Sequence, residues 1–504
     1  MRGECESMLY FMGVDNGGTT IKAAIFDQTG HEIAAASQNT PLLVPCEGFN
    51  ERDMETLWEA TAATIHKAIL KSGIQPSEIA GVGCTGHGKG LYLWGKDDKP
   101  AYHAVASTDR RGAPYVERWY GNGTAAKAES LALQPVVETQ PVAILAWMKE
   151  HHPEILENTR WIFEAKDYIR FMLTGRAMAE VTDYSGTCLM NLQTKEFDRE
   201  LLRLFDLEEM FDALPPLCQS YELCGTVTEK AAKDTGLAAG TPVCGGMFDI
   251  DACAIALDVS TTERLCMITG TWSINEYIAK EPVPTGSSTH NSMFCIPGYY
   301  LIEESSPTSS GNLEWFIQHF VPGAEDPNVD KKALYREIDR EVEALSPGDC
   351  NIIFLPFLYG TYNEKCASSA FIGMTNFHTR AHMLRAIFEG VGFSHLHHIE
   401  ALLAHRNPPS AIRMAGGATN SDVWVQIFAD ITGTPIEVVK TKEPGALGCA
   451  MAAAIAAGVY PDYKTAAENM TKVSAIIHPN KENTEIYRKK YTRFCRLIEL
   501  LSQQ

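Results

Sequence analysis

The stretch "YFMGVDNGGTTIKAAIFD", Tyr10 to Asp27, decides the fold, because two apolar runs flank one short polar tip. The tip holds Asp15, Asn16, two glycines and two threonines, and Lys22 follows it. Asn-Gly is a strong hairpin signal, so an ordinary β-turn is one interpretation of the tip. The other is a phosphate cradle, because glycines let a ligand approach backbone N–H groups and hydroxyls donate. A carboxylate beside phosphate then needs Mg²⁺ between the two.

The elements around the tip predict an α/β domain that opens with an antiparallel meander. Apolar residues at helical spacing then predict a helix, which Gly73 ends. The following strand breaks at a glycine-rich segment, and the spacing of a P-loop is absent. The predicted elements are the strands Met8–Val14, Ile21–Phe26 and His31–Ser37, the helix Glu51–Ser72 and the strand Ile79–Cys84.

The opening pattern returns near residue 264, with Gly270-Thr271 at the matching turn. Helices and strands then alternate, up to an alanine-rich helix that is too short to span a bilayer. We therefore predict a duplicated α/β fold with a cleft between the copies, divided into residues 8–257 and 258–504. The predicted strands are Arg264–Thr269, Trp272–Ile278, Tyr299–Glu303, Ile352–Phe357, Ile412–Ala415 and Ile436–Val439, and the helices are Gly311–Phe320, His378–His405, Ser421–Thr432 and Pro444–Gly458.

The bulk composition bounds the class of protein. A chain of 504 residues exceeds a single core, which stops growing near ~250–300 residues, so two domains are expected. A net charge of −20 argues against a nucleic-acid or membrane-surface partner, but not against a small anionic ligand. The 14 cysteines lack zinc spacing and are expected as free thiols in a reducing cytoplasm. No signal peptide is expected.

Two further glycine turns are candidate nucleotide contacts. Gly270-Thr271 alone would be a plain turn, but a matching turn in a duplicated fold lets two tips hold one polyphosphate from both sides. In "MAGGATNSDVW", Met414 to Trp424, two glycines separate a strand from a helix. A base or phosphate can approach such a backbone. Equally, Asn420 or Ser421 can simply be the N-cap of the helix.

The segment "GGMFDIDACAIAL" places Asp249 and Asp251 just before an apolar helical run. One carboxylate can be a first-turn acid favoured by the helix dipole. The other can be a general base that takes a proton from a substrate hydroxyl. Sequence patterns do not choose between the two. Histidines of the long helix lack zinc spacing and are expected in the core or at the surface; they are His395, His397 and His398.

Two segments of the first half carry side chains suited to a polyol. "TGHGKG" contains His87 and Lys89, and "STDRR" contains Asp109 and Arg110. Sugars are recognised by dense hydrogen bonding to their hydroxyls. The alternative is that these residues are turn positions and solvated surface charges.

Taken together, the motifs resemble the FGGY family of carbohydrate kinases, within the actin-like ATPase superfamily. The resemblance covers about Tyr10 to Ser474 and rests on the order of motifs: an Asp-x-Gly-[Gly/Thr]-[Ser/Thr] hairpin, a Gly-Gly-x-x-Asp segment, a Gly-Thr hairpin and a Gly-Gly-Ala-x-Asn turn. It implies two ribonuclease H-like domains, ATP and Mg²⁺ as cofactors, a small-molecule sugar substrate, a cytoplasmic enzyme and, as in many relatives, a homodimer.

The resemblance also implies roles for individual residues. Asp249 matches the catalytic base and, with Asp15, the carboxylates near Mg²⁺. His87, Lys89 and Asp109 fall in segments that line the sugar site, together with Asp249. The positions that match ATP contacts are Gly18, Thr19, Thr20, Lys22, Gly270, Thr271, Gly311, Gly416, Gly417 and Asn420.

Within the family, the segments "TGHGKGLYLW", "STDRR", "SSPTSSGNLEWF" and "FLPFLYG" look most similar to L-xylulose kinases, which also phosphorylate 3-keto-L-gulonate. D-xylulose kinases carry Trp-Asn-Asp where this chain has Ser107-Thr108-Asp109, and Met-His where it has Gly-His. D-xylulose, L-ribulose and glycerol are the alternative substrates. A nucleotide-switched actin-like ATPase is the alternative from another class, although such proteins need inserts or an added domain.

Overall fold

The computed structural model describes residues 8–270, 272–284, 289–324, 326, 329–360 and 368–501. The chain forms two compact units that are not contiguous in sequence. One comprises the chain up to Ser260 with Ile278–Leu301 and Glu443–Thr471, and the other comprises Thr261–Tyr277, Ile302–Lys442 and the chain from Lys472 onward. The division into residues 8–257 and 258–504 stays a prediction.

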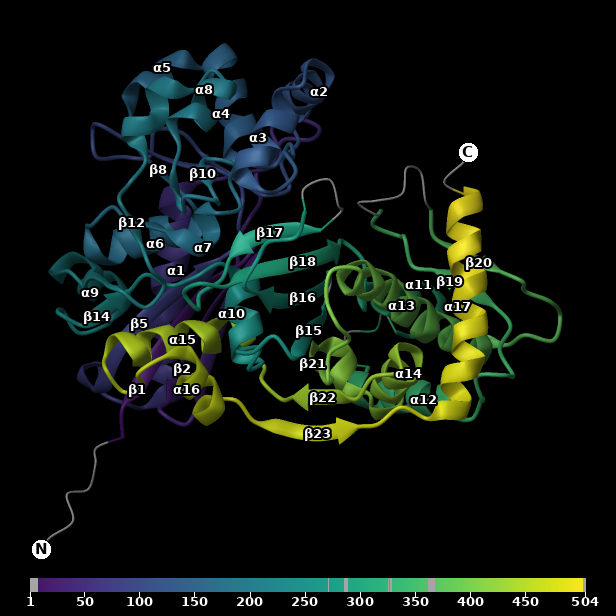
Figure 1. Cartoon of the computed structure of the whole chain (residues 1–504). Helices are drawn as coiled ribbons and strands as arrows, with labels where there is room; N and C mark the ends of the chain where they lie inside the picture. The colour runs from purple at the N-terminus through teal and green to yellow at the C-terminus, as the bar shows by residue number, and fades with distance from the viewer. Residues whose placement is uncertain are drawn as a thin grey trace, which may run out of the picture. The chain divides into compact units, whose positions relative to one another are not determined.

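The first unit is built on a six-stranded sheet of order β13-β14-β5-β1-β2-β3 (Figure 1). The predicted meander is present: β1 pairs antiparallel with β2, and β2 pairs antiparallel with β3. On the other side β1 pairs parallel with β5. The strands are β1 (Tyr10–Asn16), β2 (Thr20–Asp27), β3 (Glu32–Asn39), β5 (Ile79–Gly86), β13 (Leu223–Thr226) and β14 (Pro242–Cys244).

The second unit repeats this plan. Its sheet contains the order β18-β16-β15-β21-β22-β23, in which β15 pairs antiparallel with β16 and parallel with β21. The same sequence of antiparallel and parallel neighbours in both sheets supports the predicted duplication. The strands are β15 (Arg264–Thr269), β16 (Ser273–Ala279), β18 (Tyr300–Ser306), β21 (Ala411–Gly416), β22 (Ile436–Val439) and β23 (Val473–Ile477).

The predicted helices are present; Gly311–Phe320 keeps its predicted bounds, and the others have shifted ends. The largest shift is in α1 (Met54–Ser72), which starts three residues after the predicted Glu51 because Asp53 is its N-cap and accepts from Thr56 N. Glu51–Arg52 instead form the short strand β4. Helices of the first unit used below are α2 (Ala113–Asn122), α6 (Ala165–Thr174), α7 (Val181–Tyr184), α10 (Asp249–Ala256), α15 (Pro444–Ala456) and α16 (Tyr463–Met470); those of the second are α11 (Gly311–Phe320), α12 (Lys331–Glu343), α13 (Arg380–Leu403), α14 (Asp422–Thr432) and α17 (Lys481–Leu501).

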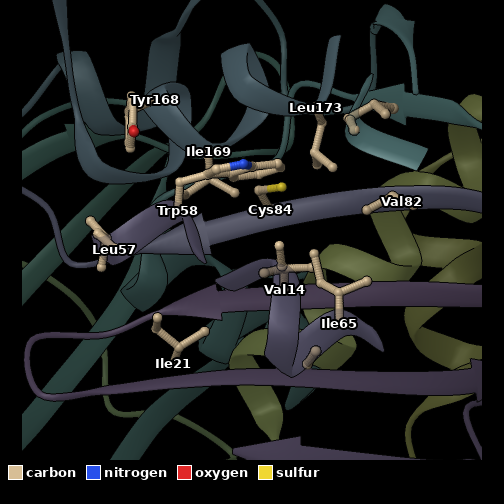
Figure 2. Packing of buried hydrophobic residues seen from close by; sticks show 14 of the residues in the cluster. Val14, Ile21, Leu57, Trp58, Ile65, Val82, Cys84, Tyr168, Ile169 and Leu173 are labelled. Carbon is tan, nitrogen blue, oxygen red and sulfur yellow. The ribbon is translucent and has the colours of Figure 1, made fainter. Parts of the chain in front are cut away.

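Helices cover both faces of the first sheet. Figure 2 shows Val14 and Val82 of the strands with Trp58 of α1 and Ile169 of α6, all in one buried cluster. Neighbouring strand residues point to opposite faces, so Gly13 and Gly83 face away from this cluster. A Cβ at Gly13 would lie 1.9 Å from Ala446 O, and one at Gly83 would lie 2.4 Å from Cys449 O. Small residues thus let α15 approach the opposite face.

Helix α15 is the predicted alanine-rich helix, and its residues from Gly445 to Ala454 are buried. Within the described ranges, no helix combines the length and the apolar character needed to cross a bilayer. The cysteines in the described residues are free thiols: Cys46 is exposed, Cys253 and Cys495 are half-buried, and the others are buried.

Candidate active site

The first hairpin tip lies between β1 and β2. Asp15 and Lys22 are cross-strand partners at the base of the tip. Gly17 N donates to Thr20 O at 3.2 Å and closes the turn. Gly18 and Thr19 are exposed, so their backbone is accessible to a ligand. The segment is therefore an ordinary hairpin whose tip is open to a ligand at Gly18 and Thr19.

A carboxylate that the sequence patterns did not single out joins this tip. Glu443, the N-cap residue of α15, lies with its Oε2 2.8 Å from Lys22 Nζ. Burial raises the pKa of Asp15 to about 6, Lys22 opposes the rise, and the charge of Glu443 adds to it. Burial lowers the pKa of Lys22, but its hydrogen bond and charge interaction with Glu443 outweigh this and raise it.

The two aspartates of the mid-chain segment have different surroundings. Asp251 is fully buried, and its Oδ1 accepts from Cys295 N at 2.9 Å. Asp249 is half-buried and is the first residue of α10. The residue before it, Phe248, donates its N–H to Thr182 Oγ1 at 2.9 Å. This contrast supports Asp249 as the residue accessible to substrate, a choice that sequence patterns left open.

The end of β5 places His87 beside the first hairpin. His87 N donates to Asn16 O at 3.1 Å, and its Nε2 lies 2.8 Å from Tyr92 Oη. Burial, followed by the charge of Arg52, lowers the pKa of His87 to about 4. The imidazole is therefore neutral at physiological pH. Lys89 follows with a left-handed backbone, φ 63°, and is half-buried.

Asp109 is placed differently from its predicted role at the sugar site. It is fully buried, and its Oδ1 accepts from Arg111 N and Arg111 Nε, both at 2.9 Å. Its Oδ2 accepts from Asn50 N at 2.7 Å and from Arg111 Nη2 at 2.8 Å. Four donors fill the capacity of one carboxylate. These contacts favour a structural role, and direct sugar binding by Asp109 stays a prediction.

In the second unit, the predicted ATP positions gather at the ends of β15 and β21. Ser310, just before Gly311, donates from Oγ to Gly270 O at 2.7 Å. Gly416 has φ 105°, and a Cβ there would lie 2.6 Å from Thr269 O. Only glycine tolerates this approach of backbone to backbone.

The remaining predicted ATP positions of the second unit include Gly417 and Asn420, which lie directly after β21. Gly417 begins a short 3₁₀ helix whose last residue, Asn420, donates from Nδ2 to Gly417 O at 3.1 Å. Ser421, not Asn420, is the N-cap of α14 and accepts from Trp424 N. Thr271 lies outside the described residues.

Comparison with known proteins gives the class of this protein. Residues 10–256 match the N-terminal domain of the FGGY family of carbohydrate kinases, and residues 265–457 match its C-terminal domain. The chain therefore belongs to the FGGY family and is a carbohydrate kinase with that family's two-domain fold. As a sugar kinase it acts on a small-molecule sugar and uses ATP as the second substrate.

Particular relatives match over the full chain. The L-xylulose/3-keto-L-gulonate kinase of Escherichia coli (strain K12) is 36% identical over 501 residues, which cover 98% of this chain and 97% of that protein. A probable L-xylulose kinase of Haemophilus influenzae is 35% identical over 508 residues, covering 98% and 99%. A xylulose kinase of Bacillus subtilis is 27% identical over 489 residues, covering 95% of each.

Solved structures support the fold. The gluconate kinase from Lactobacillus acidophilus superimposes with a TM-score of 0.88 at 23% identity, covering 98% of this chain and 99% of that one. The ligand-bound xylulose kinase from the same organism also gives 0.88 at 23% identity, covering 98% of each chain. At this level of identity the likeness concerns the fold alone.

Proposed function

We propose that this kinase transfers the γ-phosphoryl group of ATP to a terminal hydroxyl of L-xylulose or of 3-keto-L-gulonate, in carbohydrate catabolism. The products are the 5-phosphate of the ketopentose and the 6-phosphate of the gulonate. The observation that carries the proposal is full-length identity of 35–36% to two relatives named for these sugars. The lower identity of 27% to a xylulose kinase makes D-xylulose the second candidate.

Asp249 is proposed as the general base. Its carboxylate accepts the proton of the sugar hydroxyl while that oxygen attacks the γ-phosphorus and ADP leaves. Its half-buried position at the start of α10 supports this role, because the helix dipole favours an anion there. His87 and Lys89 are proposed to contact sugar hydroxyls.

The phosphates of ATP are proposed to lie against the two glycine turns. Gly18, Thr19, Thr20 and Lys22 would serve one side, and the turn at Gly270-Thr271 the other. The group around Gly311, Gly416, Gly417 and Asn420 is proposed to contact the adenosine. Lys22 has to exchange its contact with Glu443 for one with phosphate, at least in part.

The carboxylates of the first hairpin fit a magnesium ion. Asp15 has a raised pKa beside Glu443, and a cation relieves this repulsion. Mg²⁺ binds through one or two carboxylates plus substrate phosphates, rather than through an all-protein cage. In the described part of the chain, no group of three or more His, Cys, Asp or Glu is placed to bind a metal. Asp15 would hold the ion, with Asp249 as the second carboxylate, and bound Mg²⁺ would neutralise developing phosphoryl charge.

A coupled assay of ADP release over L-xylulose, 3-keto-L-gulonate, D-xylulose, L-ribulose and glycerol tests the proposal. We expect the highest kcat/KM for one of the first two sugars. A highest value for D-xylulose, L-ribulose or glycerol would reassign the substrate. ATP turnover that is independent of every sugar would instead support a nucleotide-switched ATPase.

Location and assembly are further proposals. Free thiols in the described residues support a reducing compartment, the cytoplasm. A homodimer is expected from the resemblance, and light scattering of the purified protein tests it.

A further inference from the structure

Arg52 of β4 is a buried cation with two unused donors. Its side chain is among the largest that are almost fully buried, at 1% exposure. Nη1 donates to Gly17 O at 3.1 Å. Nε and Nη2 are buried and have no hydrogen-bond partner among the described residues. Burying polar donors without partners costs free energy, and native proteins seldom do so without a functional reason.

The two unused donors form one edge of the guanidinium group. Nε and Nη2 point their N–H bonds in parallel along this edge, within the plane of the group, and the edge binds two oxygens of one acceptor group. Carboxylates and phosphoryl groups match it, because their oxygens have the required spacing. The unsatisfied edge therefore indicates a ligand with paired or anionic oxygens.

Arg52 interacts with residues that are proposed to contact the substrates. Gly17 belongs to the hairpin tip proposed to contact phosphate, and the charge of Arg52 also acts on His87, which is proposed to contact the sugar. His87 N is itself bonded to Asn16 O, next to Gly17. Arg52 thus interacts with both regions of the first unit that are proposed to contact substrate.

A second buried group, the carboxyl group of Glu164, also lacks hydrogen-bond partners among the described residues. Neither carboxylate oxygen of Glu164 has a hydrogen-bond partner within the described ranges, although the residue is fully buried. The charges of Arg52 and Glu164 both act on Tyr92, whose hydroxyl contacts His87. The strand end and the start of α6 are close here, since a Cβ at Gly86 would lie 3.2 Å from Ala165 Cβ.

Burial, more than the neighbouring charges, favours the protonated form of Glu164. Burial, and then the charge of Asp183, raise the pKa of Glu164 well above its usual range, while Lys166 opposes and Asp167 adds to the rise. A protonated carboxyl group can donate one hydrogen bond and accept others. It therefore complements hydroxyl groups, as Arg52 complements anionic oxygens.

We propose that Arg52 contacts the reacting substrates, with its Nε–Nη2 edge receiving two oxygens from the phosphoryl group in transfer or from the sugar. The proposal rests on the kinase function proposed above. It makes Arg52 a binding residue that the motif comparison does not include, and it explains why an arginine is buried with two of its three guanidinium nitrogens unpartnered among the described residues.

The test compares Arg52→Gln and Arg52→Lys with Arg160→Gln, a control on the surface of the same unit, where Arg160 pairs with Asp98. We expect kcat/KM to fall about 100-fold in R52Q, as for loss of one preorganised donor set. R52K keeps the cation but lacks the fork, so we expect it to restore little activity. Because the Nε–Nη2 edge has no partner in the described residues, we expect the melting temperature of ligand-free R52Q to be unchanged or higher. Arg160→Gln should match the wild type.

Two further measurements distinguish the source of the oxygens. Calorimetric titration of the sugar without nucleotide should give an unchanged Kd if the phosphoryl group is the partner, with the loss confined to kcat. A Kd for sugar raised tenfold or more would assign the contact to the sugar instead. Should R52Q not fold, R52K carries the same comparison.

The proposal is overturned if both variants keep kcat and both KM values within threefold of the wild type. It is also overturned if R52Q loses activity only in step with a lower melting temperature and R52K restores both. Neither result would contradict the proposed kinase function. That function is contradicted only if the wild type releases no ADP in response to any sugar tested.

Discussion

Lys22 Nζ lies 2.8 Å from Glu443 Oε2, so the cation of the first hairpin is paired with a carboxylate that begins α15. The two residues are 421 positions apart, the difference between 443 and 22. The side chains are 36% and 19% exposed, so the pair contributes no more than about 1 kcal/mol to stability. Its larger effect is electrostatic, because Glu443 adds negative charge beside Asp15.

Removing this charge is expected to weaken Mg²⁺ binding. In Glu443→Gln the cation is attracted by one carboxylate fewer, so the Mg²⁺ concentration for half-maximal activity should rise several-fold while kcat at saturating Mg²⁺ changes little. A magnesium titration of the initial rate at fixed ATP measures this. Glu468→Gln, at an exposed site on α16, is the control. An unchanged magnesium dependence would show that Glu443 does not act on the metal.

Substitutions of the half-buried Asp249 and the buried Asp251 are expected to have different effects, the first on kcat and the second on stability. Asp249→Asn should lower kcat by about 10²–10⁴-fold, the usual contribution of a general base, with little change in melting temperature. Asp251→Ala leaves Cys295 N without its acceptor and should cost about 1–3 kcal/mol of stability. Steady-state kinetics and thermal unfolding of both variants measure the contrast. Full activity in Asp249→Asn would remove it as the base.

Substitution of Asp109 distinguishes a structural role of this residue from a role in sugar binding. Arg111 and Asp109 are both fully buried, and removing one partner of such a pair costs about 3–5 kcal/mol. Asp109→Asn should therefore lower the urea midpoint strongly, with KM for sugar unchanged in the folded fraction. A higher KM at unchanged stability would instead support direct sugar binding. Arg199→Gln, which breaks an exposed pair with Asp212, is the matched control.

Local patterns in the sequence were sufficient for the fold. The hairpin at Asn16, the alanine-rich α15 and the repeated strand order are all visible as turn residues and periodicity, and the structure has them. The ends of elements were less predictable. Helix α1 begins at Met54 because the side chain of Asp53 caps it, whereas the helix was predicted to begin at Glu51.

Residues of the candidate site could be predicted from the sequence only where they belong to a recognisable motif. Contacts between distant segments leave no local pattern, so Glu443 beside Lys22 and Arg52 beside Gly17 were not predicted. The one available signal was that Glu443 stands directly before a Pro-Gly helix start, which is weak. Burial likewise distinguishes Asp249 from Asp251, and spacing does not.

Close helix packing in the first unit depends on Gly448 of α15. A Cβ there would lie 2.2 Å from Ala252 O of α10, three residues after Asp249. Gly448→Ala must push the two helices apart, so we expect a loss of about 1–3 kcal/mol and a lower kcat. Gly121→Ala in α2 is the matched control, because its Cβ meets nothing within 4 Å. Denaturant unfolding and kcat compare the two, and equal stabilities would contradict the packing argument.

His395 of α13 is expected to make stability depend on pH. It is fully buried, with Nδ1 2.9 Å from Asn275 Oδ1 and Nε2 2.9 Å from Ser309 Oγ. Burial, followed by the charge of His398, lowers its pKa to about 3. The unfolded chain, with a pKa near 6.5, takes up a proton first as the pH falls. Stability from this group is thus complete above pH about 6.5 and is lost down to about 3.

The resulting slope is measurable between pH 7 and pH 5. One titrating group contributes up to about 1.4 kcal/mol per pH unit, so His395 should account for a loss of about 2 kcal/mol over this interval. His395→Gln keeps a polar side chain that does not titrate, so its unfolding free energy should fall by that much less. His405→Gln, at an exposed histidine, should retain the wild-type slope. Parallel slopes in all three proteins would mean that the pKa of His395 in the folded state is close to its value in the unfolded chain.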